Sequence, residues 1–194
     1  MKNFLKVVSI IGLTSITQLA YSTENNGGHN IGDTGPAGGI VFYVTDDGLH
    51  GLEAAPNDSE ALAWGCGGER INGAFGAAIG TGGQNTFDIA SKCGESSAAA
   101  AVVANTKING LLGWYLPSKE ELHEMWDKLA DSDGDGTNSG PTDPNNLGGF
   151  AAGYYWSSSQ SSSKYAWYRH FLNGRQAGWG NKSLTRKVRA VRAF

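Results

Sequence analysis

The change from helical to strand-like periodicity along the chain constrains the fold more than any other feature. The segment from Ser118 to Leu129 predicts a core helix: Ser118 and Glu121 form a capping box, and apolar residues then recur at intervals of three and four. Beyond residue 153, short aromatic and β-branched runs are separated by Gly and Asn: "YYWSSS", "YAWYRHF" and "TRKVRAVRAF". Helices followed by strands predict an α+β domain with an antiparallel sheet, not a β-α-β alternation.

The first half of the chain predicts a hairpin and two short helices. "GIVFYV", residues 39–44, is typical of a buried strand, and residues 48–56 supply its partner after an Asp-Asp-Gly turn. Thr86 is a candidate cap for a short helix ending at Cys93, and Ser96 or Ser97 is a candidate start for another. The stretch "NGRQAG", near residue 175, predicts a turn.

The N-terminus has the three parts of a secretory signal peptide. Lys2 and Lys6 flank the start of the apolar run "VVSIIGLTSITQLA", and Ala20 and Ser22 are small residues suited to cleavage after Ser22. The alternative, a membrane anchor, needs about 20 apolar residues, and this run is shorter. We therefore expect residues 1–22 to be removed on export, to the periplasm, the cell surface or the medium, with no transmembrane segment after cleavage.

The remaining chain suits one domain. About 170 residues follow the signal peptide, enough for one hydrophobic core. We expect a short leader over residues 23–31 and a single domain over residues 32–194. A polar loop insert occupies residues 131–147.

The two cysteines, Cys66 and Cys93, predict a structural disulfide. In an oxidising compartment an even number of cysteines favours pairing. Closing a loop of this length stabilises a fold by about 3–4 kcal/mol when the geometry permits.

The C-terminal part of the chain is basic. No Asp or Glu follows Asp143, although the formal net charge of the whole chain is −3. Such asymmetry favours a basic face that meets an anionic partner. The alternative, that several of these cations pair with carboxylates from the first half, is equally consistent with the sequence. The cations from residue 164 onward are Lys164, Arg169, Arg175, Lys182, Arg186, Lys187, Arg189 and Arg192.

The polar loop contains a partial calcium-binding pattern. Asp131, Asp133 and Asp135 occupy positions 1, 3 and 5 of an EF-hand-like loop, and Gly136 is at position 6. The residue at position 12 is Thr142 instead of a bidentate glutamate. The loop is thus either a calcium site or a solvated loop.

Catalytic motifs are weak in this sequence. Ser157, Ser158 and Ser159 lack the Gly-x-Ser-x-Gly elbow, and no carboxylate near His170 in the sequence orients that imidazole. The histidines have no zinc-protease spacing, and the phosphate-binding glycine motifs are absent. We expect a protein that is not an enzyme and that needs no cofactor apart from the calcium that its acidic loop suggests.

Aromatic rings near the C-terminus suggest a binding surface. Ring faces stack on the C–H faces of sugars, and Arg, Lys, Ser and Asn bond hydroxyl or sulfate groups. Strand alternation places Trp167 and Arg169 on one side and Tyr168 and His170 on the other. Nucleic acid would also suit rings with cations, but export argues against it. The candidate ligand-binding residues are Lys164, Tyr168, Arg169, Arg175, Trp179 and Lys182.

A series of motifs resembles the Lcl C-terminal domain family, named after a collagen-like surface adhesin of Legionella. The motifs occur in order from about Gly32 to Phe194: "GPAGGIVFYV", "GLEAAP", the two cysteines flanking "IGTGGQNT", "GWYLPSKEEL", "YWSSS" and "VRAVRAF". The resemblance implies a C-type-lectin-like domain with an antiparallel sheet and two or three helices, exported and displayed, with its ligand near the C-terminal strands.

The resemblance also implies a ligand class. It points to glycans, including sulfated glycosaminoglycans and other polyanions, bound by an adhesin-like module. A different interpretation of the same residues is a structural or protein-binding surface domain whose rings form a homo-oligomer, such as a trimer.

Overall fold

The computed structural model describes residues 27–194. The signal peptide predicted over residues 1–22 and the first four residues of the leader, 23–26, lie outside the described residues. Within residues 27–194, no helix combines the length and hydrophobicity that crossing a membrane requires.

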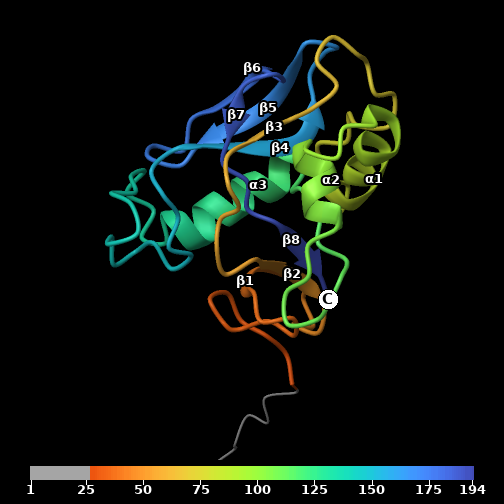
Figure 1. Cartoon of the computed structure of the whole chain (residues 1–194). Helices are drawn as coiled ribbons and strands as arrows, with labels where there is room; N and C mark the ends of the chain where they lie inside the picture. The colour runs from red at the N-terminus through yellow and green to blue at the C-terminus, as the bar shows by residue number, and fades with distance from the viewer. Residues whose placement is uncertain (1–26) are drawn as a thin grey trace, which may run out of the picture.

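The described chain forms short strands on either side of a central helix (Figure 1). The helices are α1 (Gly82–Cys93), α2 (Ala99–Ala104), α3 (Lys119–Met125) and a π-helical turn, η1 (Trp126–Ala130). The strands are β1 (Ile40–Val44), β2 (Gly51–Ala54), β3 (Leu62–Ala63), β4 (Tyr154–Gln160), β5 (Tyr165–His170), β6 (Gln176–Asn181), β7 (Thr185–Arg186) and β8 (Val191–Ala193).

The strands of the described chain pair antiparallel, so the predicted α+β class is confirmed. One sheet has the order β1-β2-β8, a second pairs β3 with β7, and a third has the order β4-β5-β6. Helix α3 lies between the first and third sheets and contacts β1, β4 and β5, while α1 and α2 pack together on one side (Figure 1). The C-terminal strand β8 thus joins the N-terminal hairpin, which closes the domain.

The helix boundaries differ from the sequence prediction in three places. Helix α1 begins at Gly82, one turn before the predicted cap Thr86, and α2 begins at Ala99 instead of following Ser96 or Ser97 directly. The start of α3, in contrast, agrees with the prediction, because the capping box of Ser118 is present. Ser118 Oγ accepts from Glu121 N, and Glu121 Oε2 accepts from Ser118 N at 2.7 Å. The last part of the predicted core helix is the π-helical turn η1.

The sequence prediction missed strand β6, where it placed only a turn. Gly178 and Gly180 suggest a loop in the sequence, but in the structure they lie inside a strand. A Cβ at Gly180 would lie 2.5 Å from the Trp156 ring and 2.7 Å from Tyr168. Glycine is therefore needed there because two rings press against the strand, an effect of packing that local periodicity does not report.

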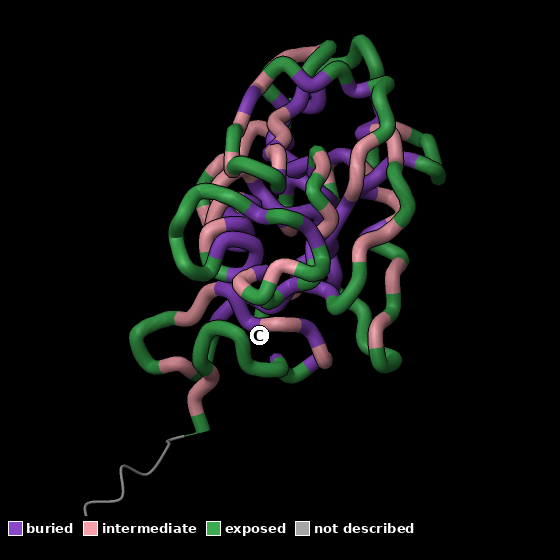
Figure 2. Tube along the Cα trace, turned by 90° about the vertical axis from the view of Figure 1, so that its left-hand side faces the viewer, coloured by how far each residue is buried: buried purple, intermediate pink, exposed green. Residues whose placement is uncertain are grey.

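Two hydrophobic clusters form the core, which Figure 2 shows as the buried centre of the tube. One surrounds Trp64, Trp114 and Trp156, and the other includes Phe150 and Phe171. The predicted disulfide between Cys66 and Cys93 is confirmed and ties the end of α1 to the loop after β3. These clusters hold the third sheet, on which the candidate site lies.

Candidate functional site: a ring-lined hollow on the third sheet

A hollow of about 260 Å³ opens on the β4-β5-β6 sheet. Three aromatic residues and a histidine contribute to its walls, and amide and guanidinium groups complete them. We call it the ring hollow, and its lining residues are Tyr154, Tyr168, His170, Asn173, Arg175, Gln176, Ala177 and Trp179.

Antiparallel pairing brings the rings of the ring hollow together. Tyr154 on β4 is opposite His170 on β5, and their rings stack with centroids 4.3 Å apart. Tyr168, two residues before His170, turns to the same face, and its ring meets Tyr154 edge-to-face at 5.4 Å. Trp179 on β6 completes the wall, and its side chain is 71% exposed. Tyr154, which lines the same hollow, is 47% exposed, and an exposed apolar patch of this kind, bordered by polar residues, is a feature of interaction sites.

Arg186 places a positive charge next to these rings. Its guanidinium carbon lies 3.9 Å from the Tyr168 ring centroid and 4.8 Å from that of Tyr154. Burial lowers the pKa of Arg186, while the neighbouring tyrosines oppose that shift. These cation–π contacts favour the observed positions of the Tyr154 and Tyr168 rings.

Three of the six predicted ligand-binding residues line the ring hollow. Tyr168, Arg175 and Trp179 come from two strands and the turn between them, and the structure brings them to one place. Lys164 is exposed in the hairpin between β4 and β5 and is not among the lining residues.

The surface position expected for Arg169 is wrong. Arg169 is only 5% exposed, because strand alternation turns it toward η1, where its guanidinium carbon lies 5.2 Å from the Trp126 ring centroid. Its Nη1 donates to the Gly174 carbonyl. Burial lowers the pKa of Arg169 to about 10. The side chain fills an internal space and cannot reach a ligand in the ring hollow.

The surface position expected for Lys182 is also wrong. Lys182 is fully buried, and its Nζ donates to the Glu69 carbonyl and to Gln160 Oε1, each at 2.9 Å. The ammonium also lies 4.3 Å from the centroid of the Trp64 ring. This lysine fastens the loop after β3 to the third sheet and is not available to an external ligand.

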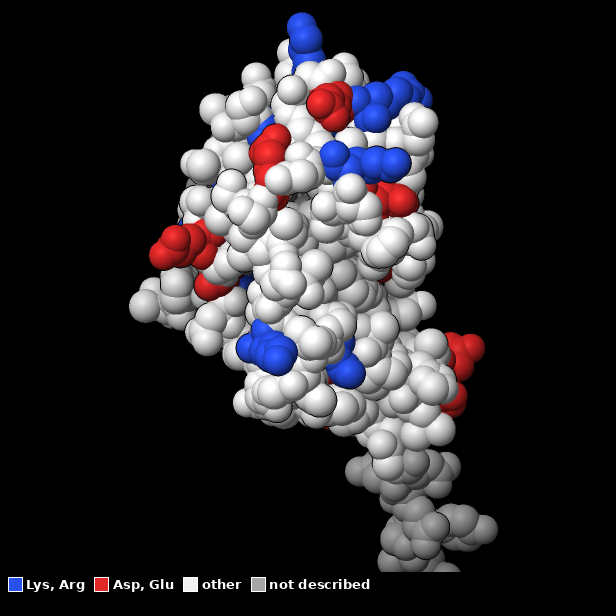
Figure 3. Space-filling view, turned by 45° about the vertical axis from the view of Figure 1, so that its right-hand side comes forward, with Lys and Arg blue, Asp and Glu red and all other residues white. Residues whose placement is uncertain are grey.

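Carboxylates from the first half of the chain pair with some of the C-terminal cations, as the alternative interpretation proposed. Arg189 Nε lies 2.7 Å from Asp58 Oδ1, and Arg192 Nη1 lies 3.4 Å from Glu53 Oε1. Glu53 is itself buried and accepts from the amides of the "GPAGG" turn. On the face that Figure 3 shows, basic side chains are interspersed with acidic ones. Arg189 and Arg192 are paired with carboxylates and therefore do not contribute to the contiguous basic face expected from the sequence.

The serine run after Trp156 is internal. Ser157, Ser158 and Ser159 are buried, and their hydroxyls donate to the carbonyls of Trp167, Pro117 and Gly76, respectively. These hydroxyls pin β4 to its neighbours, so they are not surface groups for a ligand.

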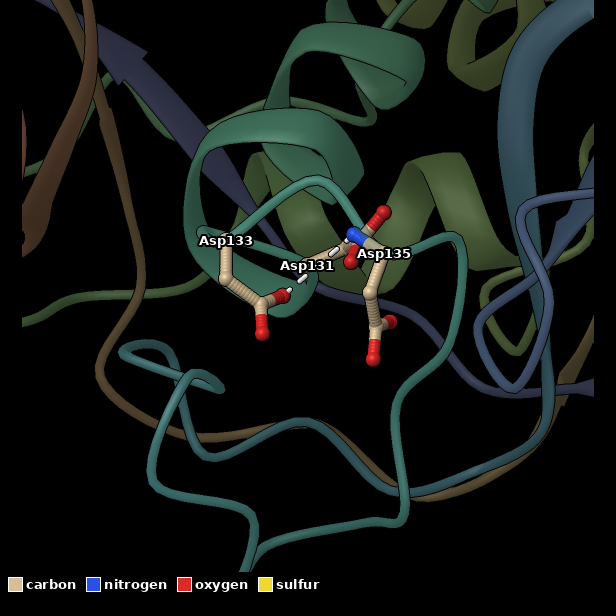
Figure 4. Close-up of side chains that lie close together, drawn as sticks. All are labelled: Asp131, Asp133 and Asp135. Atoms are coloured by element: carbon tan, nitrogen blue, oxygen red, sulfur yellow. Dashed lines mark hydrogen bonds between the residues drawn. The ribbon is translucent and has the colours of Figure 1, made fainter.

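The structure brings the three acidic loop residues together (Figure 4). Asp131, Asp133 and Asp135 each offer an oxygen within 4.8 Å of the others. The Asp131 carboxylate accepts from Gly136 N at 3.0 Å, and its pKa is raised by burial. Asp143 instead accepts from two amides of its own loop. The residues thus provide part of a hard-cation ligand set, and calcium binding stays a prediction.

Sequence reasoning did not propose Tyr154, His170, Asn173 or Gln176 as ligand contacts. Tyr154 and His170 lie in the aromatic runs "YYWSSS" and "YAWYRHF", and their cross-strand pairing follows once the β4-β5 register is known. Asn173 and Gln176 gave no signal, because one lies in a turn and the other begins the strand that was missed.

The comparison with protein-family models agrees with the motifs. The model of the Lcl C-terminal domain matches residues 57–192, which is most of the chain. The chain belongs to the Lcl C-terminal domain family. No curated protein matches the chain. The family assignment indicates an adhesin-like module of the bacterial surface, and the disulfide agrees with an extracellular location. The C-type-lectin-like character of this Lcl C-terminal domain stays a prediction.

Proposed function

We propose that this Lcl C-terminal domain is an exported, non-enzymatic binding module that holds a sugar ring of a glycan in the ring hollow. The observation that carries the proposal is the meeting of Tyr154, Tyr168 and Trp179 around a hollow of about 260 Å³ on one sheet face. Accessible rings offer stacking surface to a sugar, and the packing of Tyr154 and Tyr168 against each other and against Arg186 reduces the conformational entropy that binding would cost.

Polar groups around the ring hollow suit a hydroxylated ligand with negative charge. Arg175 is exposed at the rim, and Asn173 and Gln176 add amide groups. Arg186 keeps a cation behind the rings. Guanidinium groups bond carboxylates and sulfates with two parallel hydrogen bonds, so uronic and sulfated sugars are the preferred ligands of this proposal.

A glycan array tests the proposal most broadly. The purified protein is applied to the array with calcium and, separately, with a chelator. We expect retention on sulfated or uronic glycans and weaker retention on neutral ones. Signals that depend on calcium would support a role of the acidic loop. A protein that binds no glycan under either condition would contradict the proposal.

A second candidate function is assembly through the same sheet. Besides Trp179, the C-terminal strands and turns expose Tyr154, Tyr165, Leu172 and Leu184, each at 40% or more. Such an apolar surface also suits a subunit interface, for example that of a trimer. Size-exclusion chromatography with light scattering separates the two: a stable oligomer that Trp179→Ala dissociates, with an array that stays silent, would favour assembly over glycan binding.

A further inference from the structure

A second hollow lies apart from the ring hollow, between the segment after β2 and the end of α2. Its volume of about 420 Å³ is within the range of small-molecule sites, about 300–1,000 Å³. In Figure 1 the loop that follows α2 runs down beside β2 and β8, and this loop forms one wall. We call it the α2 hollow, and the lining residues that matter here are Ala55, Asp58, Val103, Lys107, Ile108 and Ala190.

The floor of the α2 hollow is apolar and its backbone groups are paired. Ala55, Val103 and Ala190 are all buried. Ala55 N donates to the Ala190 carbonyl at 2.8 Å, and the Ala55 carbonyl accepts from Arg189. The floor is therefore not a free strand edge that would add a peptide strand. Its small side chains leave space for an aliphatic group of a ligand.

The wall formed by the loop after α2 is held in place by its own hydrogen bonds. Thr106 N donates to the Val103 carbonyl at 2.9 Å, and Ile108 and Leu111 pair as an isolated bridge. Asn109 Nδ2 reaches across to the Ala37 carbonyl at 3.0 Å. The α2 hollow is thus formed before any ligand arrives, which lowers the entropic cost of binding.

The two charged residues that line the α2 hollow differ in whether they have an ion-pair partner. The Asp58 carboxylate is already paired, accepting from Arg189 Nε at 2.7 Å and from the Tyr155 hydroxyl at 2.6 Å. Lys107 is exposed, and among residues 27–194 no carboxylate lies within ion-pair distance of its ammonium. The unbalanced charge at the α2 hollow is therefore positive.

We propose that the α2 hollow binds a small aliphatic carboxylate, with the apolar body on the alanine and valine floor and the carboxylate next to Lys107. An uncharged aliphatic molecule would gain only the contact with the floor. A sugar would find no ring to stack on, because the lining contains no aromatic side chain. The inference does not depend on the glycan proposal, since the two hollows share no lining residue.

Hexanoate and hexanol are matched probes for this site, followed by NMR chemical shifts of the purified protein. We expect hexanoate to shift the backbone amide signals of Ala55, of residues 57–59 and of residues 103–109; Pro56 has no amide proton. Lys107→Gln should weaken hexanoate binding by about three- to tenfold and leave hexanol binding unchanged, because it removes only the charge contact. High salt should weaken hexanoate binding in the wild type in the same way.

Two further variants test whether hexanoate binds at the α2 hollow and not elsewhere on the protein. Lys92→Gln removes an exposed lysine elsewhere, at the end of α1, and should leave hexanoate binding unchanged. Thr106→Trp fills the rim of the α2 hollow and should abolish binding of both probes, with the fold checked by thermal unfolding. The proposal is overturned if hexanoate shifts no signals around the α2 hollow, or if Lys107→Gln and Lys92→Gln weaken it equally.

Discussion

Arg189 and Lys182 are both buried cations, but their surroundings differ. Arg189 has a carboxylate partner in Asp58 and donates further bonds to the carbonyls of Ala55 and Gly148. The hydrogen-bond acceptors of Lys182 are neutral oxygens. Burial therefore lowers the pKa of Lys182 to about 8 from its ordinary value of 10.5, with the charge of Glu69 opposing the shift.

The lowered pKa of Lys182 predicts a rise in stability with pH. Between about pH 8 and pH 10 the unfolded chain binds more protons at this lysine than the folded protein, so the free energy of unfolding increases. We expect a rise of about 2 kcal/mol in the wild type relative to Lys182→Met, measured by urea unfolding across that range.

The rise in the free energy of unfolding with pH should end at about pH 10. Burial raises the pKa of Tyr115 and of Tyr155, so above about pH 10 the unfolded tyrosines ionise first and stability falls again. Lys164→Met, which changes an exposed lysine, should follow the wild-type curve. Parallel curves for the wild type and Lys182→Met would show that the lysine titrates as it does in water.

At the scale of elements, patterns within one segment were sufficient for much of the fold. The capping box predicted the start of α3, and the alternation of "YAWYRHF" predicted that Trp167 and Arg169 lie on one side of the strand and Tyr168 and His170 on the other, as they do in the structure. Alternation did not show which side is internal, so Arg169 was wrongly expected at the surface. Strand β6 could not be predicted in this way, since its glycines are required by rings that come from other strands.

The disulfide adds a covalent link between two segments that also share one hydrophobic cluster. Cys66 lies in the loop after β3, and Cys93 ends α1, with a sequence separation of 27 residues. Replacing both with alanine should lower the free energy of unfolding by about 3–4 kcal/mol, because the unfolded chain regains the entropy of an open loop.

Guanidinium unfolding with and without a reducing agent measures this effect. Reductant should lower the stability of the wild type toward that of the Cys66→Ala/Cys93→Ala variant and leave the variant unchanged. Equal stability of the oxidised wild type and the double variant would contradict a stabilising role for this bond.

At the scale of the whole molecule, long-range pairing explains why the basic tail does not form one basic face. The sequence showed that carboxylates are absent after Asp143, but not that Asp58 and Glu53 would meet Arg189 and Arg192 more than 130 residues later. Which cation is internal depends on the three-dimensional arrangement of the sheets, and periodicity within a segment carries no information on it.

Because several C-terminal cations are paired or buried, we expect ligand binding at the ring hollow, where aromatic and basic side chains stay exposed. Trp179 and Arg175 are its most accessible aromatic and basic groups. Phe87 on α1, 65% exposed, and Lys164 in the β4-β5 hairpin offer the same chemistry at places outside it. These four residues therefore form matched pairs of test and control.

The most direct test is the dissociation constant of the glycan that the array retains best, measured by calorimetry. Trp179→Ala and Arg175→Gln should each weaken binding by about tenfold, equivalent to about 1.4 kcal/mol, while Phe87→Ala and Lys164→Gln leave it unchanged. If Trp179→Ala binds the glycan as tightly as Phe87→Ala does, the ring hollow is not the glycan site.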